Sequence, residues 1–149
     1  SDLTLALEHI QDPGNLGTIL RSAAAFGVKT VVCSTDTVDC YSPKVVQASM
    51  GALFHLNVVY TDLEEYLSKE KASKRIYGTH LQGDNLYQTT LQQPAILVMG
   101  NEANGLSPKL EKLLHQKLRI PHDASVESLN VSMATTVFLA EYRRRVDWE

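Results

Sequence analysis

Short apolar runs alternate with helix-like periodicities along this chain, and the alternation constrains its fold more than any other feature. A short apolar run bounded by polar or turn residues is typical of a buried strand, whereas apolar residues spaced three and four apart indicate one helix face. Strands separated by helices form parallel sheets, because a crossover must bring the chain back to the same edge. We therefore expect one α/β domain over residues 1–149, with a mostly parallel sheet flanked by helices. The expected strands are residues 4–10, 30–34, 56–60, 75–80, 95–100 and 117–120.

Residues that begin or end helices lie between these strands. Ser42-Pro43 and Ser107-Pro108 each place a cap residue before a proline at the first helical position. Gly27 suits the end of the first helix, and Asn130 suits the start of the last. The arginines at 143–145 suit the dipole at the end of that last helix. The apolar faces are expected to comprise Leu16, Ile19, Leu20, Ala23 and Ala24 in the first helix, and Val46, Met50 and Leu53 in the second.

The bulk composition is that of an ordinary globular protein. Hydrophobic residues make up 44% of the chain and charged residues 21%. No apolar stretch approaches the roughly 20 residues that span a bilayer, and no secretory signal is visible, so we expect no membrane partner. Cys33 and Cys40 provide no disulfide framework and fit a reducing, cytoplasmic location. The net charge of −3 lacks the basic excess of a stand-alone nucleic-acid-binding domain.

Three polar segments are the candidate ligand-binding loops. They are residues 12–21 (DPGNLGTILR), 98–105 (VMGNEANG) and 128–132 (SLNVS). The first two directly follow predicted strands, and ligands bind beyond the carboxyl ends of the strands in open α/β sheets. Gly100 and Gly105 permit a close approach of the backbone to a ligand. The third segment sets two hydroxyls and an amide at the mouth of a helix, so its polar groups are expected to face a ligand.

In this order, the three segments resemble the signature motifs of the SpoU family of RNA 2′-O-ribose methyltransferases, in the SPOUT superfamily. Residues 41–52 (YSPKVVQASMGA) are also similar to that family, and the resemblance extends over residues 5–142. The resemblance implies a deep C-terminal trefoil knot, a homodimer and S-adenosylmethionine as cofactor. It also implies an RNA substrate. We expect ribosomal RNA in preference to transfer RNA, because long flanking extensions that could wrap a tRNA are absent. Because the chain is acidic and members often carry a separate N-terminal RNA-binding domain, we expect that domain to be missing here.

The resemblance also assigns roles to individual residues. Arg21 is expected to act near the target ribose, supplied across the dimer interface to the partner's cofactor. Because a guanidinium stays protonated in proteins, gripping the flanking phosphate suits Arg21 better than accepting the proton. No metal is expected, since His80 and His122 have no other ligands at suitable spacing. The implied catalytic residues are Asn15, Arg21, Glu102, Ser128 and Asn130, and the implied cofactor-binding residues are Thr79, Gly100, Ile120 and Leu129.

Simpler interpretations of these residues stay open at this stage. Asn15 and Asn130 could be helix caps, Arg21 a solvated charge, Glu102 an anion at a helix entry, and Gly100 part of a turn. A dinucleotide-binding loop is disfavoured, because residues 12–17 hold an incomplete Gly-x-Gly-x-x-Gly pattern. Two other functions remain: a non-catalytic RNA-binding or ribosome-assembly module on the same fold, and a nucleotide-binding α/β domain with accidental motif matches.

Overall fold

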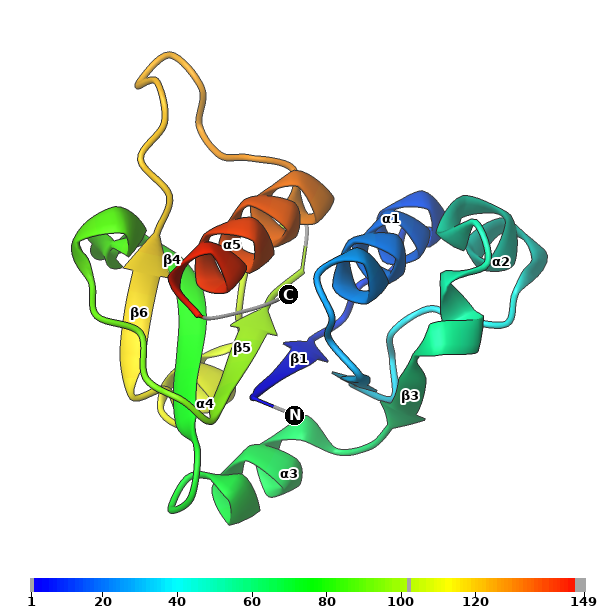
Figure 1. Cartoon of the computed structure of the whole chain (residues 1–149), viewed down its shortest axis with the longest axis horizontal. Helices are drawn as coiled ribbons and strands as arrows, with labels where there is room; N and C mark the ends of the chain where they lie inside the picture. The colour runs from blue at the N-terminus through cyan, green and yellow to red at the C-terminus, as the bar shows by residue number, and fades with distance from the viewer. Residues whose placement is uncertain (1, 102, 147–149) are drawn as a thin grey trace.

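The computed structural model describes residues 2–101 and 103–146 and has a central six-stranded sheet (Figure 1). The strand order is β3-β2-β1-β5-β4-β6, and every neighbouring pair is parallel. Each of the six predicted strands forms, so the prediction of a parallel α/β fold is confirmed. The strands are β1 Leu3–Leu7, β2 Thr30–Cys33, β3 Asn57–Tyr60, β4 Arg75–Asn85, β5 Ala95–Met99 and β6 Gln116–Arg119.

Helices cover both faces of the sheet. Helices α1, α2 and α5 pack on one face, while α3 and α4 pack on the other (Figure 1). Two short 3-10 helices, η1 and η2, follow α2 and β4. Among the residues that the structure describes, no helix combines the length and apolar character needed to cross a membrane. The helices are α1 Pro13–Ala25, α2 Pro43–Ser49, η1 Ala52–His55, α3 Leu63–Glu70, η2 Leu86–Gln88, α4 Pro108–Glu111 and α5 Val131–Arg145.

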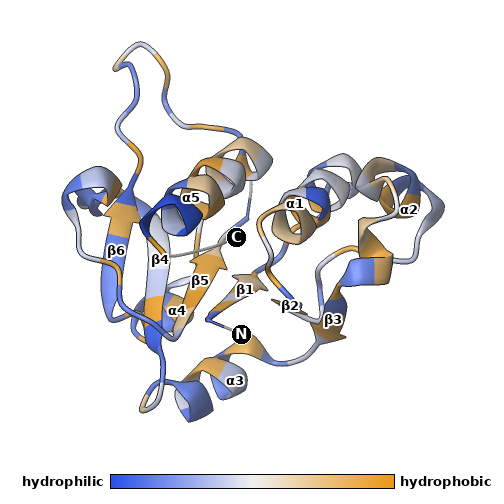
Figure 2. Ribbon diagram, in the orientation of Figure 1, coloured by the Kyte–Doolittle hydropathy of each residue, from blue (hydrophilic) through white to orange (hydrophobic). Residues whose placement is uncertain are grey.

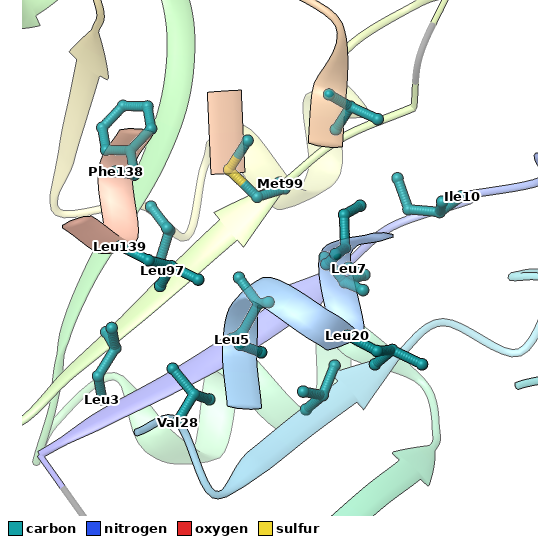
Figure 3. Packing of buried hydrophobic residues seen from close by; sticks show 14 of the residues in the cluster. Leu3, Leu5, Leu7, Ile10, Leu20, Val28, Leu97, Met99, Phe138 and Leu139 are labelled. Atoms are coloured by element: carbon teal, nitrogen blue, oxygen red, sulfur yellow. The ribbon is translucent and has the colours of Figure 1, made fainter. Parts of the chain in front are cut away.

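The central strands β1 and β5 are buried along their whole length, and Figure 2 shows hydrophobic residues concentrated there. Successive strand residues point to opposite faces, so Leu5 and Leu7 join the core under α1 and α5, whereas Ala6 joins the core over α3 and α4. Figure 3 shows Leu5, Leu7 and Met99 in the first of these cores. Burial of each such leucine contributes about 1.5–3 kcal/mol, which fixes the sheet as a rigid base for the loops at its edge.

The predicted end of α1 at Gly27 is confirmed, whereas the cap at its start is Asp12 and not Asn15, which lies inside the helix. Asp12 precedes the helix, and its carboxylate accepts hydrogen bonds from the backbone nitrogens of Gly14 at 2.7 Å and Asn15 at 3.2 Å. Gly27 follows the helix with φ of 76°, the left-handed conformation that glycine adopts without strain. The chain therefore leaves β1 and enters α1 through a tightly bonded turn.

The predicted apolar face of α2 is wrong. Val45 and Ser49 are the buried residues of this helix, whereas Val46 is 44% exposed and Met50 69% exposed. The helix starts at Pro43 as predicted, but it ends after two turns because Met50 adopts a left-handed conformation with φ of 53°. The 3.6-residue period therefore does not continue beyond Ser49, and the stripe predicted from it points to solvent at Val46 and Met50.

The last helix lies against the first, far from it in sequence. The hydroxyls of Ser22 and Thr136 are hydrogen-bonded at 2.6 Å, and the Arg143 guanidinium donates to the carbonyl of Phe26 at 2.5 Å. The chain thus returns from β6, at one edge of the sheet, to a position beside α1 over its centre (Figure 1). This return brings the amino ends of α1 and α5 together.

Candidate functional site

A pocket of about 420 Å³ opens at the carboxyl ends of β5 and β6 and beside the middle of β4. Its volume falls within the range typical of small-molecule sites. Thr79, Gly100, Ile120 and Leu129, the residues expected to bind a cofactor, all line this pocket, and Ser128 lines it as well. Five residues from four segments of the chain therefore meet at one cavity at the edge of the sheet.

The loop after β5 forms one wall through its backbone. Asn101 and Gly105 exchange two backbone hydrogen bonds, at 3.1 and 2.9 Å, which close the loop into a tight turn. The side-chain carbonyl of Asn101 accepts from the backbone nitrogens of Ala103 and Asn104 at 2.9 and 3.0 Å. Gly105 has φ of 68°, in the left-handed region that glycine adopts without strain. Asn101 was not predicted as a site residue, although it lies inside the motif.

Gly100 is required by contact rather than by its dihedral angles. A Cβ atom at this position would lie 2.4 Å from the carbonyl carbon of Gly105 and 2.5 Å from the nitrogen of Leu106. Both are backbone atoms, which cannot move aside as a side chain could. Gly100 and the segment at Gly105 therefore lie in direct backbone contact. The pocket wall at this point consists of backbone atoms, whose polar groups can form hydrogen bonds with the edge of a flat ligand.

A bulge in β4 forms the opposite wall. The pairing of β4 with β6 shifts register between Thr79 and Asp84, so the residues between them leave the ladder. His80 and Leu81 of the bulge line the pocket, together with Glu111 from α4. The Glu111 carboxylate lies 3.2 Å from the Lys117 amine and 4.0 Å from Nε2 of His80. Glu111 therefore places a carboxylate in a pocket whose lining is part apolar and part polar.

The loop between β6 and α5 projects beyond the sheet and borders the pocket from above (Figure 1). Nδ1 of His122 lies 3.0 Å from the Ile120 carbonyl, and Nε2 lies 3.1 Å from the Val126 carbonyl. A neutral imidazole can donate only one of these two hydrogen bonds. Hydrogen bonds from Ser125 lower the pKa of the Asp123 carboxyl in the same loop. These local bonds give shape to a loop that is exposed along most of its length.

Asn130 joins the amino ends of two helices. Its side-chain carbonyl caps α5 by accepting from the backbone nitrogens of Ser132 and Met133 at 2.9 and 3.3 Å. Its amide donates to the side-chain carbonyl of Asn15 on α1 at 3.1 Å. The capping interpretation of Asn130 is therefore confirmed. Asn15 and Asn130 come together even though 115 positions separate them in the sequence.

The remaining predicted residues lie elsewhere. Arg21 is exposed on α1 and is not among the residues that line the pocket of its own chain. Glu102 lies outside the described residues. Groups of three or more His, Cys, Asp or Glu side chains arranged to hold a metal ion do not occur in residues 2–101 and 103–146.

Some residues that shape the pocket carried no sequence signal of their own. Glu8 lies within the predicted strand 4–10 but directly follows β1 in the structure, and it bonds to Ser107. Phe138 reaches the pocket from the buried face of α5. An apolar residue at helical spacing, such as Phe138, is predicted only as core. A polar residue immediately after a buried strand is the one signal that could have drawn attention to Glu8.

Comparison with known proteins agrees with this geometry. The model of the SpoU rRNA Methylase family matches residues 2–140. The chain belongs to this family. An uncharacterised tRNA/rRNA methyltransferase of Synechocystis is 43% identical over 147 residues, which cover 96% of this chain and 53% of that protein. The 23S rRNA (guanosine(2553)-2′-O)-methyltransferase of Bacillus subtilis is 36% identical over 141 residues, which cover 93% of this chain and 57% of that protein.

A solved structure within the SpoU and TrmH group matches closely. The AdoMet-bound rRNA methyltransferase of Sinorhizobium meliloti superposes with a TM-score of 0.92 at 32% identity, over 99% of this chain and 58% of that one. The chain therefore spans a little over half the length of the relatives that it matches.

Proposed function

We propose that this chain is the catalytic part of an S-adenosylmethionine-dependent RNA 2′-O-ribose methyltransferase that acts on ribosomal RNA. The observation that carries the proposal is the convergence of Thr79, Gly100, Ile120 and Leu129 on one pocket at the edge of the sheet. The names of the relatives support it, because the Bacillus subtilis protein is a 23S rRNA 2′-O-methyltransferase and the Sinorhizobium meliloti structure contains AdoMet. Transfer RNA is the alternative substrate, since the Synechocystis relative is named for both RNAs.

The pocket fits S-adenosylmethionine on two grounds. Its apolar walls, which include Ile120, Leu129 and Phe138, suit the flat adenine ring, and its volume of about 420 Å³ suits a ligand of this size. The bare backbone around Gly100 and Gly105 is a cradle that a side chain would fill. We therefore assign adenine and ribose binding to Thr79, Gly100, Ile120 and Leu129.

When bound, S-adenosylmethionine supplies a methyl group on a positively charged sulfur. The chain must then hold a ribose 2′-hydroxyl in line with that group, because alignment of two reactants removes much of the entropic barrier. The linked amides of Asn15 and Asn130 lie at the joined helix ends, and Asn130 stands between the pocket residues Leu129 and Val131. We assign the placement of the ribose or cofactor to Asn15, Ser128 and Asn130, and a hydrogen bond to the nucleotide to Glu102.

Arg21 is assigned to the pocket of a second copy of this chain. Its exposed position on α1, outside its own pocket, supports this assignment. A guanidinium binds phosphate through two parallel hydrogen bonds and remains protonated, so Arg21 holds the phosphate next to the target ribose and does not accept its proton.

A homodimer follows from that assignment, and an exposed apolar surface beside α1 supports it. We call Tyr41, Val46, Met50 and Phe54 the α2 patch; their exposed fractions are 70%, 44%, 69% and 92%. Exposed apolar residues gathered on one segment are typical of protein interfaces. Because α2 and η1 pack against α1, a partner that covers the α2 patch also lies close to the α1 helix that carries Arg21.

Calorimetric titration of the purified protein with S-adenosylmethionine and S-adenosylhomocysteine tests the proposed cofactor, with NADH as control. We expect both sulfur ligands to bind and NADH not to bind. Transfer of tritiated methyl groups to ribosomal RNA, followed by alkaline hydrolysis, then tests the reaction, because 2′-O-methylation leaves an alkali-resistant linkage. A folded protein that binds neither sulfur ligand would instead favour a non-catalytic RNA-binding or ribosome-assembly module.

The variant Arg21→Ala distinguishes a role in methyl transfer from a role in cofactor binding. We expect methyl transfer to fall by at least about a hundredfold, because the phosphate that places the ribose is no longer held, while cofactor affinity stays within about threefold. Arg21→Lys should recover only part of the rate, since lysine lacks the planar fork. An Arg21→Ala enzyme with full activity would remove Arg21 from the reaction.

Two further assignments accompany this function. We propose that the chain forms a deep C-terminal trefoil knot, supported by the return of α5 from the β6 edge to the centre of the sheet. Pulling both ends in an optical trap tests this, because a knotted chain stays shorter than the roughly 3.6 Å per residue of a fully extended one.

We also propose a cytoplasmic location, supported by the free thiols of Cys33 and Cys40.

A further inference from the structure

We infer that Glu8 is a positioning residue, whose carboxylate fixes the wall of the candidate pocket by holding the 100–107 loop against the end of β1. Glu8 does not line the pocket, so it acts on a ligand only through that loop. The binding experiments below rest on the proposed function, whereas the exchange experiment does not.

The carboxylate of Glu8 binds the far end of the loop at two points. One oxygen accepts from the backbone nitrogen of Ser107 at 2.8 Å, and the other accepts from the Ser107 hydroxyl at 2.6 Å. Both contacts are short for their type, as is typical when the acceptor is a carboxylate. They explain why Ser107, despite its position before Pro108, does not cap α4 with its own side chain: its hydroxyl is directed to Glu8.

The segment directly after β1 also holds the start of the loop. The amide of Asn101 donates to the His9 carbonyl at 2.8 Å, and the backbone nitrogen of Glu8 donates to the Met99 carbonyl at 2.9 Å. Residues 8 and 9 therefore fix both ends of a loop whose middle carries Gly100, Gly105 and Leu106 into the pocket. A loop held at two ends by four hydrogen bonds presents one backbone conformation to a ligand.

The backbone of His9, next to Glu8, is held in a strained conformation. His9 has φ of 55°, an unusual value for a residue other than glycine. Its backbone nitrogen is held by the Ser34 hydroxyl at 2.8 Å, and its side chain lies 2.8 Å from the Asp36 carboxylate. Strained backbone persists where the surroundings determine it, and here the strain turns the His9 carbonyl toward Asn101.

Three variants distinguish positioning from electrostatics. Glu8→Ala removes both acceptors. Glu8→Gln removes the charge but keeps both bonds, because its carbonyl can accept from the Ser107 nitrogen while its amide donates to the Ser107 oxygen. Ser107→Ala removes one of the two bonds. Glu64→Ala is the matched control, since Glu64 is an exposed carboxylate on α3 that does not line the pocket.

The affinities for S-adenosylmethionine and S-adenosylhomocysteine are measured by calorimetry. We expect Glu8→Ala to weaken both ligands equally, by about tenfold, as loss of a bond to a charged group implies. Glu8→Gln should stay within about threefold of the wild type, and Glu8→Ala/Ser107→Ala should bind no more weakly than Glu8→Ala, because the two residues act through one contact. If Glu8→Gln weakened cationic S-adenosylmethionine much more than its neutral product, Glu8 would act by charge and the inference would be wrong.

Hydrogen exchange of the ligand-free protein tests the same inference independently. In the wild type the amides of Gly105 and Ser107 are bonded, so they should exchange slowly. Glu8→Ala should speed exchange across residues 100–107 while β1 and β5 stay protected; unchanged exchange would overturn the inference. If the wild type bound neither ligand, the proposed function would fail and this measurement alone would decide whether Glu8 holds the loop. Should Glu8→Ala not fold, Ser107→Ala gives the same readout.

Discussion

Gly100 has no room for a side chain, because a Cβ atom there would meet the backbone of Gly105 and Leu106 at 2.4 and 2.5 Å. Gly100→Ala must therefore move one side of the loop that lines the pocket. We expect a loss of stability of about 1–3 kcal/mol, as for other overpacked sites. S-adenosylmethionine binding should weaken by about tenfold or more, since a displaced wall no longer matches the ligand. Urea unfolding and calorimetric titration measure the two effects.

Gly105 provides the matched control for Gly100. A Cβ atom there meets nothing within 4 Å, so only its φ of 68° opposes substitution. Asparagine tolerates this left-handed conformation better than other residues with side chains, so Gly105→Asn should cost less than about 1 kcal/mol and keep most of the affinity. Equal losses in the two variants would show that the crowding at Gly100 has no special weight.

The residues of the candidate site differ in how far the sequence could predict them. Thr79, Gly100 and Ile120 follow or end predicted strands, and the parallel sheet alone brings such residues to one edge. The contact between Glu8 and Ser107 spans 99 positions of the sequence. No local pattern of residue types encodes a contact of that kind, so it emerges only from the folded backbone.

At the scale of elements, Arg143 ties the end of α5 to the end of α1. Its guanidinium donates to the carbonyls of Phe26 and Gly27, at 2.5 and 3.2 Å, and to the carboxylate of Asp2 at 2.7 Å. Its side chain is only 10% exposed, so Arg143→Ala leaves half-buried acceptors without this donor. We expect a loss of about 3 kcal/mol in unfolding free energy by urea titration, with little recovery in Arg143→Lys.

The neighbouring Arg144 is the control for that prediction. Its side chain is 70% exposed and is paired with Glu141, which Arg145 also holds. Arg144→Ala should therefore cost far less stability than Arg143→Ala, because solvent screens an exposed ion pair. Similar losses at 143 and 144 would mean that these arginines stabilise only through the helix dipole, the interpretation that their sequence position alone suggested.

Element boundaries were predictable where local signals act and not where tertiary contacts do. Asp12 and Gly27 mark the two ends of α1 as their residue types imply. Strand β4 continues to Asn85, well beyond the predicted end, because it rejoins β6 after its bulge. Helix α2 ends early at Met50, and no residue type in the sequence signals a left-handed methionine.

At the scale of the whole molecule, acid unfolding should depend on Glu141. Hydrogen bonds from Arg144, and also from Arg145, lower the pKa of this buried carboxyl from 4.5 to about 2. A carboxyl with a lowered pKa stabilises the fold above its unfolded pKa, and the stabilisation disappears as the pH falls through the folded value. At neutral pH the free energy of unfolding of the wild type should exceed that of Glu141→Gln by about 1.5–3 kcal/mol. This difference should disappear as the pH falls from 4.5 to about 2. Urea titrations across that range measure it; a difference independent of pH would contradict the pairing.

The assembly of the molecule can be tested at Phe54, which is 92% exposed in the α2 patch. If the α2 patch joins two copies, Phe54→Asp buries a charge at the interface and the protein should sediment as a monomer, where the wild type sediments as a dimer. Tyr87→Asp is the control, because Tyr87 is 50% exposed but lies on η2, away from the patch. A wild type that is monomeric at all concentrations would exclude the dimer outright.

Methyl transfer then distinguishes a shared site from a dimer that is merely stable. If Arg21 serves the partner's pocket, monomeric Phe54→Asp should lose methyl transfer but keep its own cofactor binding, since the residues assigned to the cofactor all line the pocket of one chain. A heterodimer of one Arg21→Ala chain and one Gly100→Val chain should regain up to about half the methyl-transfer activity of the wild-type dimer. In this heterodimer one intact pocket faces one intact arginine of the other chain. An active Phe54→Asp monomer, or no recovery in a purified heterodimer, would place Arg21 and the cofactor of one reaction in the same chain.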